Sequence, residues 1–239
     1  MTVTYQNDFR KELSIMAKLL WDQTGEHFFE TGIDHGILFP MVNNAYPAGV
    51  AWNGLTGVTE TPEGAEANAK YADNIKYLNL YSAETFKATV KCFTYPDEFG
   101  PCNGESTVNG LTVGQQTRQA FGLAYRTIKG NDTLGNDLGY KWHLIYNCHA
   151  TPSERDYQTV NDSPDAIEFS FEIETTPVAL TSEYATGKVY KPTSLLVIDS
   201  TTADSDALAT LEAALEGTDG TPGTDSYLPL PDAVIAMFQ

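Results

Sequence analysis

The sequence predicts a mainly β protein with one amphipathic helix near its C-terminus. From Trp21 onward, most apolar residues recur with period 2, which is typical of half-buried strands, and clusters of Gly, Asn, Asp and Pro separate these stretches. The clearest helical pattern in this part of the chain lies at residues 203–216. No internal repeat or clean domain boundary is visible, so we expect one domain over residues 16–239.

Three stretches alternate most clearly between apolar and polar residues. The sets of side chains expected in the core are Phe86, Ala88, Val90 and Cys92; Trp142, Leu144, Tyr146 and Cys148; and Ile167, Phe169, Phe171 and Ile173. The opposite face of the third stretch carries Glu168, Ser170, Glu172 and Glu174. One face of that strand is therefore predicted to be core and the other acidic.

The predicted helix at residues 203–216 rests on its spacing and its ends. Leu208, Leu211 and Leu215 recur at helical intervals, and acidic residues in the first turn suit the helix dipole. Gly217 is a typical stop signal. These features predict a helix that buries one leucine-rich stripe.

Residues 1–15 form an N-terminal extension with a different pattern. Phe9, Leu13, Met16 and Leu20 have helical spacing, and Asp8 is placed to cap a short docking helix. A second interpretation is that translation starts at Met16, because residues 10–12 can be encoded by a purine-rich stretch like a ribosome-binding site. Both interpretations stay open at this point.

Two segments lack strand periodicity and are rich in Gly, Asn and acidic residues. They are residues 60–74 and residues 96–116, and both are predicted to be long loops. Loops of this length in a compact domain are usually functional or disordered. We expect them to make contacts between subunits, and the alternative is a mobile surface loop.

The charge balance argues against nucleic-acid binding. The chain has 14 Lys and Arg against 32 Asp and Glu, a formal net charge of -18. Binding to DNA depends on neutralising phosphates with basic residues, and an excess of carboxylates opposes it. Plain solubility is the simpler explanation of the acidity. Cys92, Cys102 and Cys148 form no CxxC pair, so we expect reduced thiols and folding in a cytoplasm, without a membrane anchor or signal peptide.

The sequence offers no recognisable active site. The histidines, His27, His35, His143 and His149, form no HExxH motif, and neither a GxSxG elbow nor a phosphate-binding glycine motif is present. With 32 acidic residues, carboxylate pairs of the kind used by glycosidases are unavoidable and carry no information. We therefore expect a structural or assembly role rather than an enzyme, with no cofactor and no metal.

A series of short segments carries a resemblance to a known family. The segments are residues 21–26 (WDQTGE), 30–40 (ETGIDHGILFP), 49–58 (GVAWNGLTGV), 62–66 (PEGAE), 71–77 (YADNIKY), 95–99 (YPDEF) and 161–166 (NDSPDA). In order and spacing they resemble the major tail proteins of long, non-contractile-tailed bacteriophages that infect Gram-positive bacteria. The resemblance extends from Trp21 to about Ser194 and leaves out the N-terminal extension.

This resemblance implies a tail-tube fold, a β-sandwich or barrel with long inter-subunit loops. Subunits of such proteins close into hexameric rings that stack into the conduit for DNA ejection. The implied partners are other copies of the chain, the tape-measure, distal tail and tail-terminator proteins, and viral DNA as a passenger that is not bound. The implied location is the virion tail, after assembly in the host cytoplasm.

The resemblance also gives candidate residues for assembly. A ring of six copies would carry a charge of about -108, and part of it should line the bore and repel DNA. The lumen-facing candidates are Glu168, Ser170, Glu172 and Glu174, with outer solvent as the alternative location. The first choice for the ring-stacking loop is residues 60–74, with candidates Glu63, Glu66, Asn68, Tyr71, Asp73 and Asn74; residues 96–116 are the second choice.

Two other functions fit the same observations. The first is another virion or surface β-sandwich, such as a capsid decoration or carbohydrate-binding protein, for which the thirteen tyrosines could supply a sugar platform. The second is an enzyme, with a glycosidase as the best example. Electron microscopy separates them, because only a tail-tube protein forms tubes of stacked rings.

Overall fold

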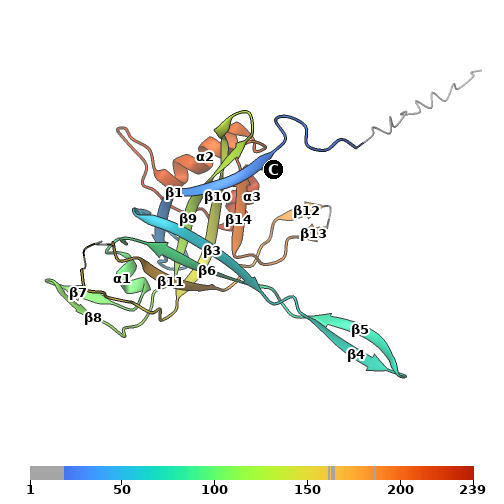
Figure 1. Ribbon diagram of the computed structural model, residues 1–239, viewed down its shortest axis with the longest axis horizontal. Coiled ribbons are helices and arrows are strands. Elements are labelled where there is room, and N and C mark those ends of the chain that lie inside the picture. The colour runs from blue at the N-terminus through green and yellow to red at the C-terminus, as the bar shows by residue number, and fades with distance from the viewer. Residues whose placement is uncertain (1–18, 161, 163–164, 186) are drawn as a thin grey trace, which may run out of the picture.

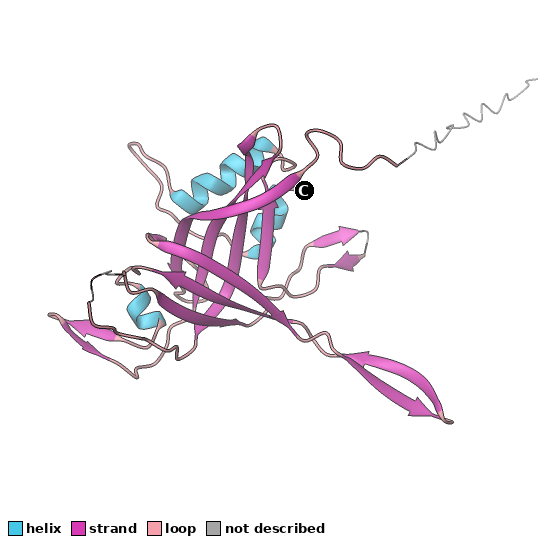
Figure 2. Cartoon of the chain, viewed as in Figure 1, coloured by secondary structure: helices cyan, strands magenta, loops and turns pink. Residues whose placement is uncertain are grey.

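A computed structural model describes residues 19–160, 162, 165–185 and 187–239. The predicted docking helix, with Phe9, Leu13 and Met16, lies outside the described residues. The prediction of a mainly β fold is confirmed (Figure 2). The strands are β1 (Phe28–Pro40), β2 (Val50–Ala51), β3 (Leu55–Glu63), β4 (Ala67–Ala72), β5 (Ile75–Tyr81), β6 (Thr85–Cys92), β7 (Ser106–Val108), β8 (Leu111–Val113), β9 (Phe121–Asn131), β10 (Gly135–Ala150), β11 (Phe169–Thr175), β12 (Glu183–Ala185), β13 (Lys188–Val189) and β14 (Leu195–Asp199); the helices are α1 (Phe99–Cys102), α2 (Ser205–Glu216) and α3 (Pro231–Met237).

One antiparallel sheet organises the molecule. Its strand order is β2-β1-β9-β10-β11-β6-β3, and β14 also pairs with β10. Three two-stranded hairpins, β4–β5, β7–β8 and β12–β13, lie outside this sheet. Figure 1 shows β4–β5 and β7–β8 at opposite ends of the longest dimension of the described chain body.

The β9–β10 pair is the centre of the sheet because both of its faces are buried. On one face Leu123 and Ile145 pack with Val90 and Phe171 of the strands that fold over them. On the other face Ala124 and Trp142 belong to a second apolar cluster, which includes the leucines of α2. The fold therefore has three layers: helices, the β1-β9-β10-β14 part of the sheet, and the β11-β6-β3 part.

A bulge in β10 makes this layering possible. The register of β10 against β9 shifts between Ile145 and Cys148, and Asn147 has a φ of 50°. Since an extra residue reverses the alternation of faces, Cys148 lies with Ile145 in one core, whereas Tyr146 lies in the other. The prediction that Cys148 shares a face with Trp142, Leu144 and Tyr146 is therefore wrong.

The same bulge divides one edge of β10 between two strands. Residues 141–145 pair with β14, and residues 148–150 pair with β11. The sheet consequently turns away from the helices and folds back on itself as an open barrel, with β1 and β3 near each other but not hydrogen-bonded (Figure 2). The space between β1 and β3 is the seam of this barrel.

The predicted helix near the C-terminus is confirmed as α2. The Asp204 side chain accepts hydrogen bonds from the backbone N–H groups of Asp206 and Ala207, at 3.1 Å and 3.0 Å. The chain leaves the helix at Gly217, whose φ of 77° suits glycine. Leu208, Leu211 and Leu215 are buried against the sheet, as their spacing predicts. The structure adds two short helices that the pattern did not predict, α1 and α3.

Both segments that were predicted as long loops contain strands and hairpin turns, which corrects that prediction. Residues 60–74 hold the end of β3, the whole of β4 and a two-residue turn at Asp73 and Asn74. Residues 96–116 hold α1 and the β7–β8 hairpin, which turns at Asn109 and Gly110. Both turns have positive φ at both positions, the geometry favoured in two-residue hairpins. Neither hairpin alternates between core and solvent, and so the period-2 signal was missing.

Phe99 of α1 lies in the core between β9–β10 and the β11-β6-β3 part of the sheet, which we call the inner core. Its truncation tests this assignment. Its ring lies 4.7 Å from that of Trp52 and 4.8 Å from that of Phe171, and its side chain is fully buried. We expect Phe99→Ala to lower the free energy of unfolding by about 3–5 kcal/mol, measured by urea denaturation. Phe93→Ala is the matched control, because Phe93 is 52% exposed and its truncation should cost much less. Equal losses in the two variants would contradict the assignment of Phe99 to the core.

Candidate assembly surfaces

The outer face of β11-β6-β3 holds the predicted lumen-facing residues. Phe171 and Ile173 of β11 are buried, whereas Glu172 and Glu174 between and beyond them are exposed. Glu168 is exposed just before the strand, and Ser170 is half-buried. The alternation predicted for this strand is thus confirmed from Phe169 onward, although Ile167 remains 39% exposed. We call this surface the outer strand face.

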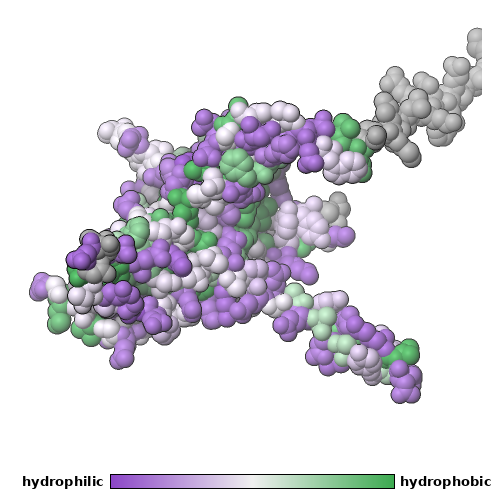
Figure 3. All heavy atoms as spheres, in the orientation of Figure 1, coloured by the Kyte–Doolittle hydropathy of each residue, from purple (hydrophilic) through white to green (hydrophobic). Residues whose placement is uncertain are grey.

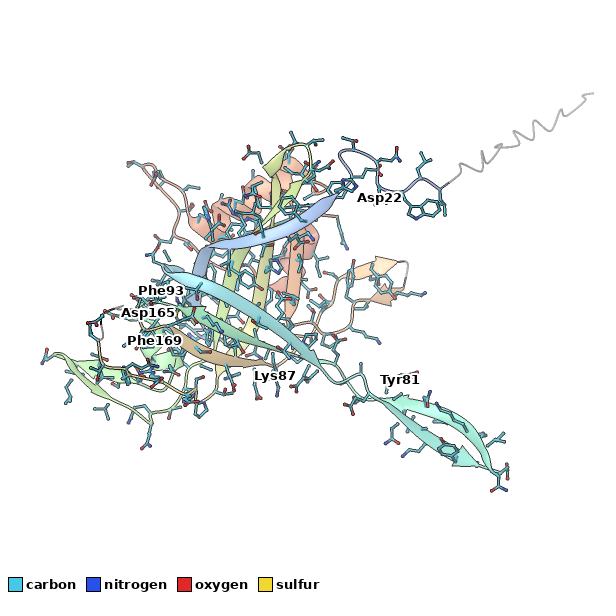
Figure 4. All side chains as sticks on the ribbon, in the orientation of Figure 1. Asp22, Tyr81, Lys87, Phe93, Asp165 and Phe169 are labelled. Carbon is cyan, nitrogen blue, oxygen red and sulfur yellow. The ribbon has the colours of Figure 1, made fainter. Side chains whose placement is uncertain are left out.

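The outer strand face is less acidic than the sequence suggests. On β6, Lys87 stands opposite Glu174, and Lys91 stands opposite Ser170. Lys87 Nζ lies 3.0 Å from carboxylate oxygens of both Glu174 and Glu63, and the hydrogen bonds that it donates to these two carboxylates raise the pKa of Lys87. Figure 4 labels Lys87 near the point where the chain leaves for the β4–β5 hairpin.

Counting the charged side chains of this face gives its local balance. Four carboxylates, Glu63, Glu168, Glu172 and Glu174, stand against Lys87 and Lys91, a net charge of -2. The face is therefore mildly acidic with an ion-paired centre. It also lies on the side of the molecule opposite α2 and α3, because these two helices cover the β1-β9-β10-β14 part of the sheet, and β11-β6-β3 closes the core on its other side.

The β3 strand presents an unpaired edge. It bonds to β6 from Leu55 to Glu63, and on its other side no strand pairs with it among the described residues. Edge strands of this length expose a row of N–H and C=O groups and are usually covered or paired in the working protein. The outer strand face and the β3 edge thus adjoin each other.

Four of the six candidates for the stacking loop lie on the β4–β5 hairpin, and a fifth lies directly beside it. Asn68 and Tyr71 lie on β4, Asp73 and Asn74 form the turn, and Glu66 precedes β4; all are exposed. The sixth candidate, Glu63, lies at the end of β3 and pairs with Lys87. The structure therefore brings the predicted residues together along one projecting element.

Both faces of this hairpin carry large exposed side chains. The cross-strand register places Lys70 opposite Leu78 and Asn68 opposite Leu80, so the leucines share one face. Tyr71 and Tyr81 lie on the other face, opposite Lys76 and Ala67. Tyr71 is 72% exposed and Ile75 is 64% exposed. Figure 3 shows this element standing clear of the main body.

Such a hairpin is unusual in a protein that works alone. An isolated two-stranded hairpin is marginally stable in water, and a third strand or another packing partner is normally needed. The two faces here expose leucines on one side and tyrosines on the other, with no core of their own. Exposed apolar surface of this kind usually marks a site of interaction with another protein.

A polar cluster in the barrel seam joins β3 to β9 and β10. Tyr125 OH donates a hydrogen bond to Glu60 Oε1, and His143 Nδ1 lies 2.9 Å from the same oxygen. His143 Nε2 lies 3.1 Å from Thr127 Oγ1, and the Tyr125 and His143 rings stack with centroids 4.7 Å apart. Only 12% of the His143 side chain is exposed. We call these four residues the seam cluster.

The seam cluster stabilises the ionised form of Glu60. The hydrogen bond with His143 is the main cause that lowers the pKa of Glu60; burial opposes it, and the Tyr125 hydroxyl adds to it. Burial raises the pKa of Tyr125, so its hydroxyl stays protonated and can donate. The cluster therefore holds β3 against the central strands at a point where no backbone ladder connects them.

The order hydroxyl, imidazole and carboxylate in this cluster is also the order of a catalytic triad. The cluster lines an open pocket of about 360 Å³ with Gly32 and Val58. The Glu60 carboxylate, however, is shared with Tyr125, and the imidazole is stacked on the Tyr125 ring. These contacts join strands, which makes a structural role the simpler interpretation. No local pattern in the sequence indicates the cluster, because Glu60, Tyr125 and His143 become neighbours only when the sheet folds over.

Other kinds of site have little support among the described residues. No group of three or more His, Cys, Asp or Glu side chains there is arranged to hold a metal ion. Cys92, Cys102 and Cys148 are buried free thiols, and burial raises the pKa of each. None of the described helices combines the length and apolar composition needed to span a bilayer.

Comparisons with known proteins add no family assignment. No protein-family model matches the chain, and no curated protein sequence matches it.

The seam cluster makes a pH-dependent contribution to stability. We expect Glu60→Gln to lower the free energy of unfolding by about 1–2 kcal/mol at neutral pH, because the ionised acceptor of two hydrogen bonds is lost. The folded-state pKa of Glu60 lies below the ordinary value of 4.5, so its contribution is complete above that pH and is lost as the pH falls through the folded pKa. The difference between the two proteins should therefore shrink below about pH 4.5.

Urea denaturation at several pH values measures this difference. Glu84→Gln is the control, because Glu84 is exposed and takes part in no ion pair among the described residues. A difference for Glu60→Gln that stays constant from neutral to acid pH would show that the carboxylate does not stabilise β3 in the proposed way.

Proposed function

We propose that the protein is a structural subunit of a bacteriophage tail tube that assembles as stacked hexameric rings and forms the conduit for viral DNA. The proposal rests on the resemblance of the sequence segments between Trp21 and Ser194 to siphophage major tail proteins. A mainly β fold with a projecting hairpin is compatible with that resemblance. The tape-measure, distal tail and tail-terminator proteins are the further partners that this function implies.

The β4–β5 hairpin is the observation that carries most weight in this proposal. It projects from the body, has apolar side chains on both faces and has no third strand among the described residues. A solitary globular domain gains nothing from such an element, whereas a subunit of a stacked assembly can bury it between rings. The residues that were chosen from sequence for ring stacking lie on or beside this same element.

Ring closure is the second requirement of a tube. In the proposed ring, the unpaired edge of β3 receives a strand of the neighbouring copy, which removes an edge that would otherwise invite aggregation. A closed ring with the same contact repeated at each boundary satisfies every edge in turn. The outer strand face, next to this edge, would then face the bore.

The proposed bore repels DNA more weakly than composition alone suggests. The outer strand face has a net charge of -2 in each copy, although the whole chain carries -18. A mildly acidic lining still disfavours phosphate contacts, and Lys87 is held by two carboxylates and is thus withdrawn from phosphate binding. DNA remains a passenger in this account.

The alternative functions make different use of the same surfaces. A capsid decoration or carbohydrate-binding protein would use the hairpin tyrosines, Tyr71 and Tyr81, as a platform for sugars. An enzyme would use Thr127, His143 and Glu60 as nucleophile, base and orienting carboxylate. Monomers with glycan affinity would support the first, and turnover of an activated ester that disappears in Thr127→Ala would support the second.

Removal of the hairpin tests the stacking role. Ser82 N donates to Glu66 O at 3.3 Å, so the ends of the hairpin adjoin and Ala67–Tyr81 can be replaced by Gly-Gly. We expect the shortened chain to keep the melting temperature of the parent and to form no tubes in electron micrographs. Asn44→Gly, at an exposed turn of the main body with a positive φ of 59°, is the control and should still form tubes. Normal tubes from the shortened chain would refute the stacking role.

Charge reversal tests the bore. Glu168→Lys combined with Glu172→Lys changes the net charge of the outer strand face by +4 in each copy, and assembled tubes should then retain labelled DNA at low salt and release it as salt rises. The control is Asp219→Lys combined with Asp225→Lys, at two exposed positions in the loop after α2. DNA retention that is equal in the two sets of tubes would place the outer strand face outside the bore.

A further inference from the structure

The two ends of the molecule carry different charges. The β4–β5 hairpin, Ala67–Tyr81, holds Lys70 and Lys76 against Asp73, a net charge of +1 in a chain of net charge -18, and Glu66 lies just outside it at its base. Both lysines are exposed, and neither takes part in an ion pair among the described residues. The element that projects farthest from one end is therefore the one that an acidic surface attracts rather than repels.

The opposite end is acidic. Residues 95–116, which include α1 and the β7–β8 hairpin, contain Asp97, Glu98 and Glu105 and no lysine or arginine. Arg118 and Arg155 lie against Gly104 and Glu105 from outside this range, so that three carboxylates and two guanidinium groups leave a net charge of -1. Arg155 forms an ion pair with Glu105, with its Nη2 atom 2.6 Å from Oε1. Asp97 and Glu98 are exposed, and the ion pairs of the described residues involve neither. This end therefore offers two carboxylates to an incoming cationic element.

The acidic end also has an apolar component. The β7–β8 register pairs Val108 with Leu111 and Ser106 with Val113, so the three apolar side chains share one face of that hairpin. Val108 is 64% exposed and Leu111 is 67% exposed. The hairpin is fixed to the body, because α1 beside it is anchored by buried Phe99 and Gln116 N donates to Gly104 O at 2.9 Å. An apolar strip beside two carboxylates complements a hairpin with leucines, tyrosines and two lysines.

We propose that the β4–β5 hairpin of one copy docks on the acidic end of a second copy, with the leucine face against Val108, Leu111 and Val113. Lys70 of the leucine face and Lys76, which lies close to the turn on the tyrosine face, then stand beside Asp97 and Glu98. This inference rests on the proposed assembly function and names the surface that receives the hairpin. The two surfaces lie at opposite ends of the long dimension (Figure 1). Contacts between different surfaces at opposite ends repeat head to tail and build an open polymer.

Charge explains why the contact is head to tail. Two hairpins brought together would oppose lysines to lysines, and two acidic ends would oppose carboxylates to carboxylates; only the mixed contact pairs opposite charges. The overall repulsion between copies acts over about 10 Å at 0.1 M salt and is screened beyond that distance. Pairs in direct contact are screened less, so the docking contact keeps its attraction under conditions in which copies can approach.

The test is a charge exchange across the proposed contact. Lys70→Glu with Lys76→Glu changes the net charge from -18 to -22, and Asp97→Lys with Glu98→Lys changes it to -14. Each pair of substitutions alone should slow tube elongation, followed by light scattering, on the order of tenfold or more, since like charges then meet at every contact. The chain with all four substitutions should recover most of the parent rate, because every contact again pairs opposite charges.

If net charge alone determined the rate of assembly, the variants would rank in a different order. If only general repulsion mattered, the variant with charge -14 would assemble faster than the parent, and so would Asp219→Lys with Asp225→Lys, which also has charge -14. The proposal expects the first to be slow and the second to be at least as fast as the parent. Equal rates for these two variants, or failure of the fourfold variant to recover, would overturn the proposal.

Zero-length carbodiimide cross-linking of the parent protein gives a second readout. Since the two surfaces lie at opposite ends of one copy, a peptide that joins Lys70 or Lys76 to Asp97 or Glu98 reports a contact between copies. Such peptides are the expected result. Tubes in which these lysines are linked only to other carboxylates would refute the docking surface and leave the tube function standing. A protein that stays monomeric and gives no cross-link between copies would refute both.

Discussion

The burial of the β9–β10 pair on both faces is the constraint on which the rest of the structure depends. Leu123 and Ile145 face a core that is closed by β6 and β11, whereas Ala124 and Trp142 face a core that is closed by the helices. Two cores can share one pair of strands only if neighbouring elements separate to opposite sides. The bulge at Asn147 achieves this separation, because it moves Cys148 to the inner core and divides the β10 edge between β14 and β11.

The sequence predicted those parts of the fold in which local pattern and burial agree. The alternation from Phe86 to Cys92 and from Phe169 to Ile173, and the leucine spacing of α2, each correspond to a single buried face. The bulge in β10 has no such signal, because the sequence around Asn147 alternates like that of an ordinary strand, and its positive φ is seen only in the structure. The β4–β5 and β7–β8 hairpins escaped detection because their side chains are exposed on both faces, so that no core imposes a period on them.

The candidate surfaces, too, could be predicted from the sequence only where they depend on a local pattern. The acidic side of β11 follows from alternation alone, but the lysines that moderate it come from β6, and their position beside Glu174 depends on strand pairing. The seam cluster depends on the folding of β3 over β9 and β10, which no local pattern encodes. The unequal charge of the two ends is present in the sequence, but it acquires meaning only when the structure places residues 67–81 and 95–116 at opposite ends.

The central claim is that this chain is a tube subunit whose projecting hairpin is covered by another copy. Electron cryo-microscopy of the assembled particle, with this chain located in its density, tests that claim most directly. The account predicts rings stacked into a tail tube, with residues 67–81 buried between successive rings and Glu172 facing the bore. A particle in which the chain lies outside the tail tube, or a tube in which the hairpin extends into solvent, would contradict it.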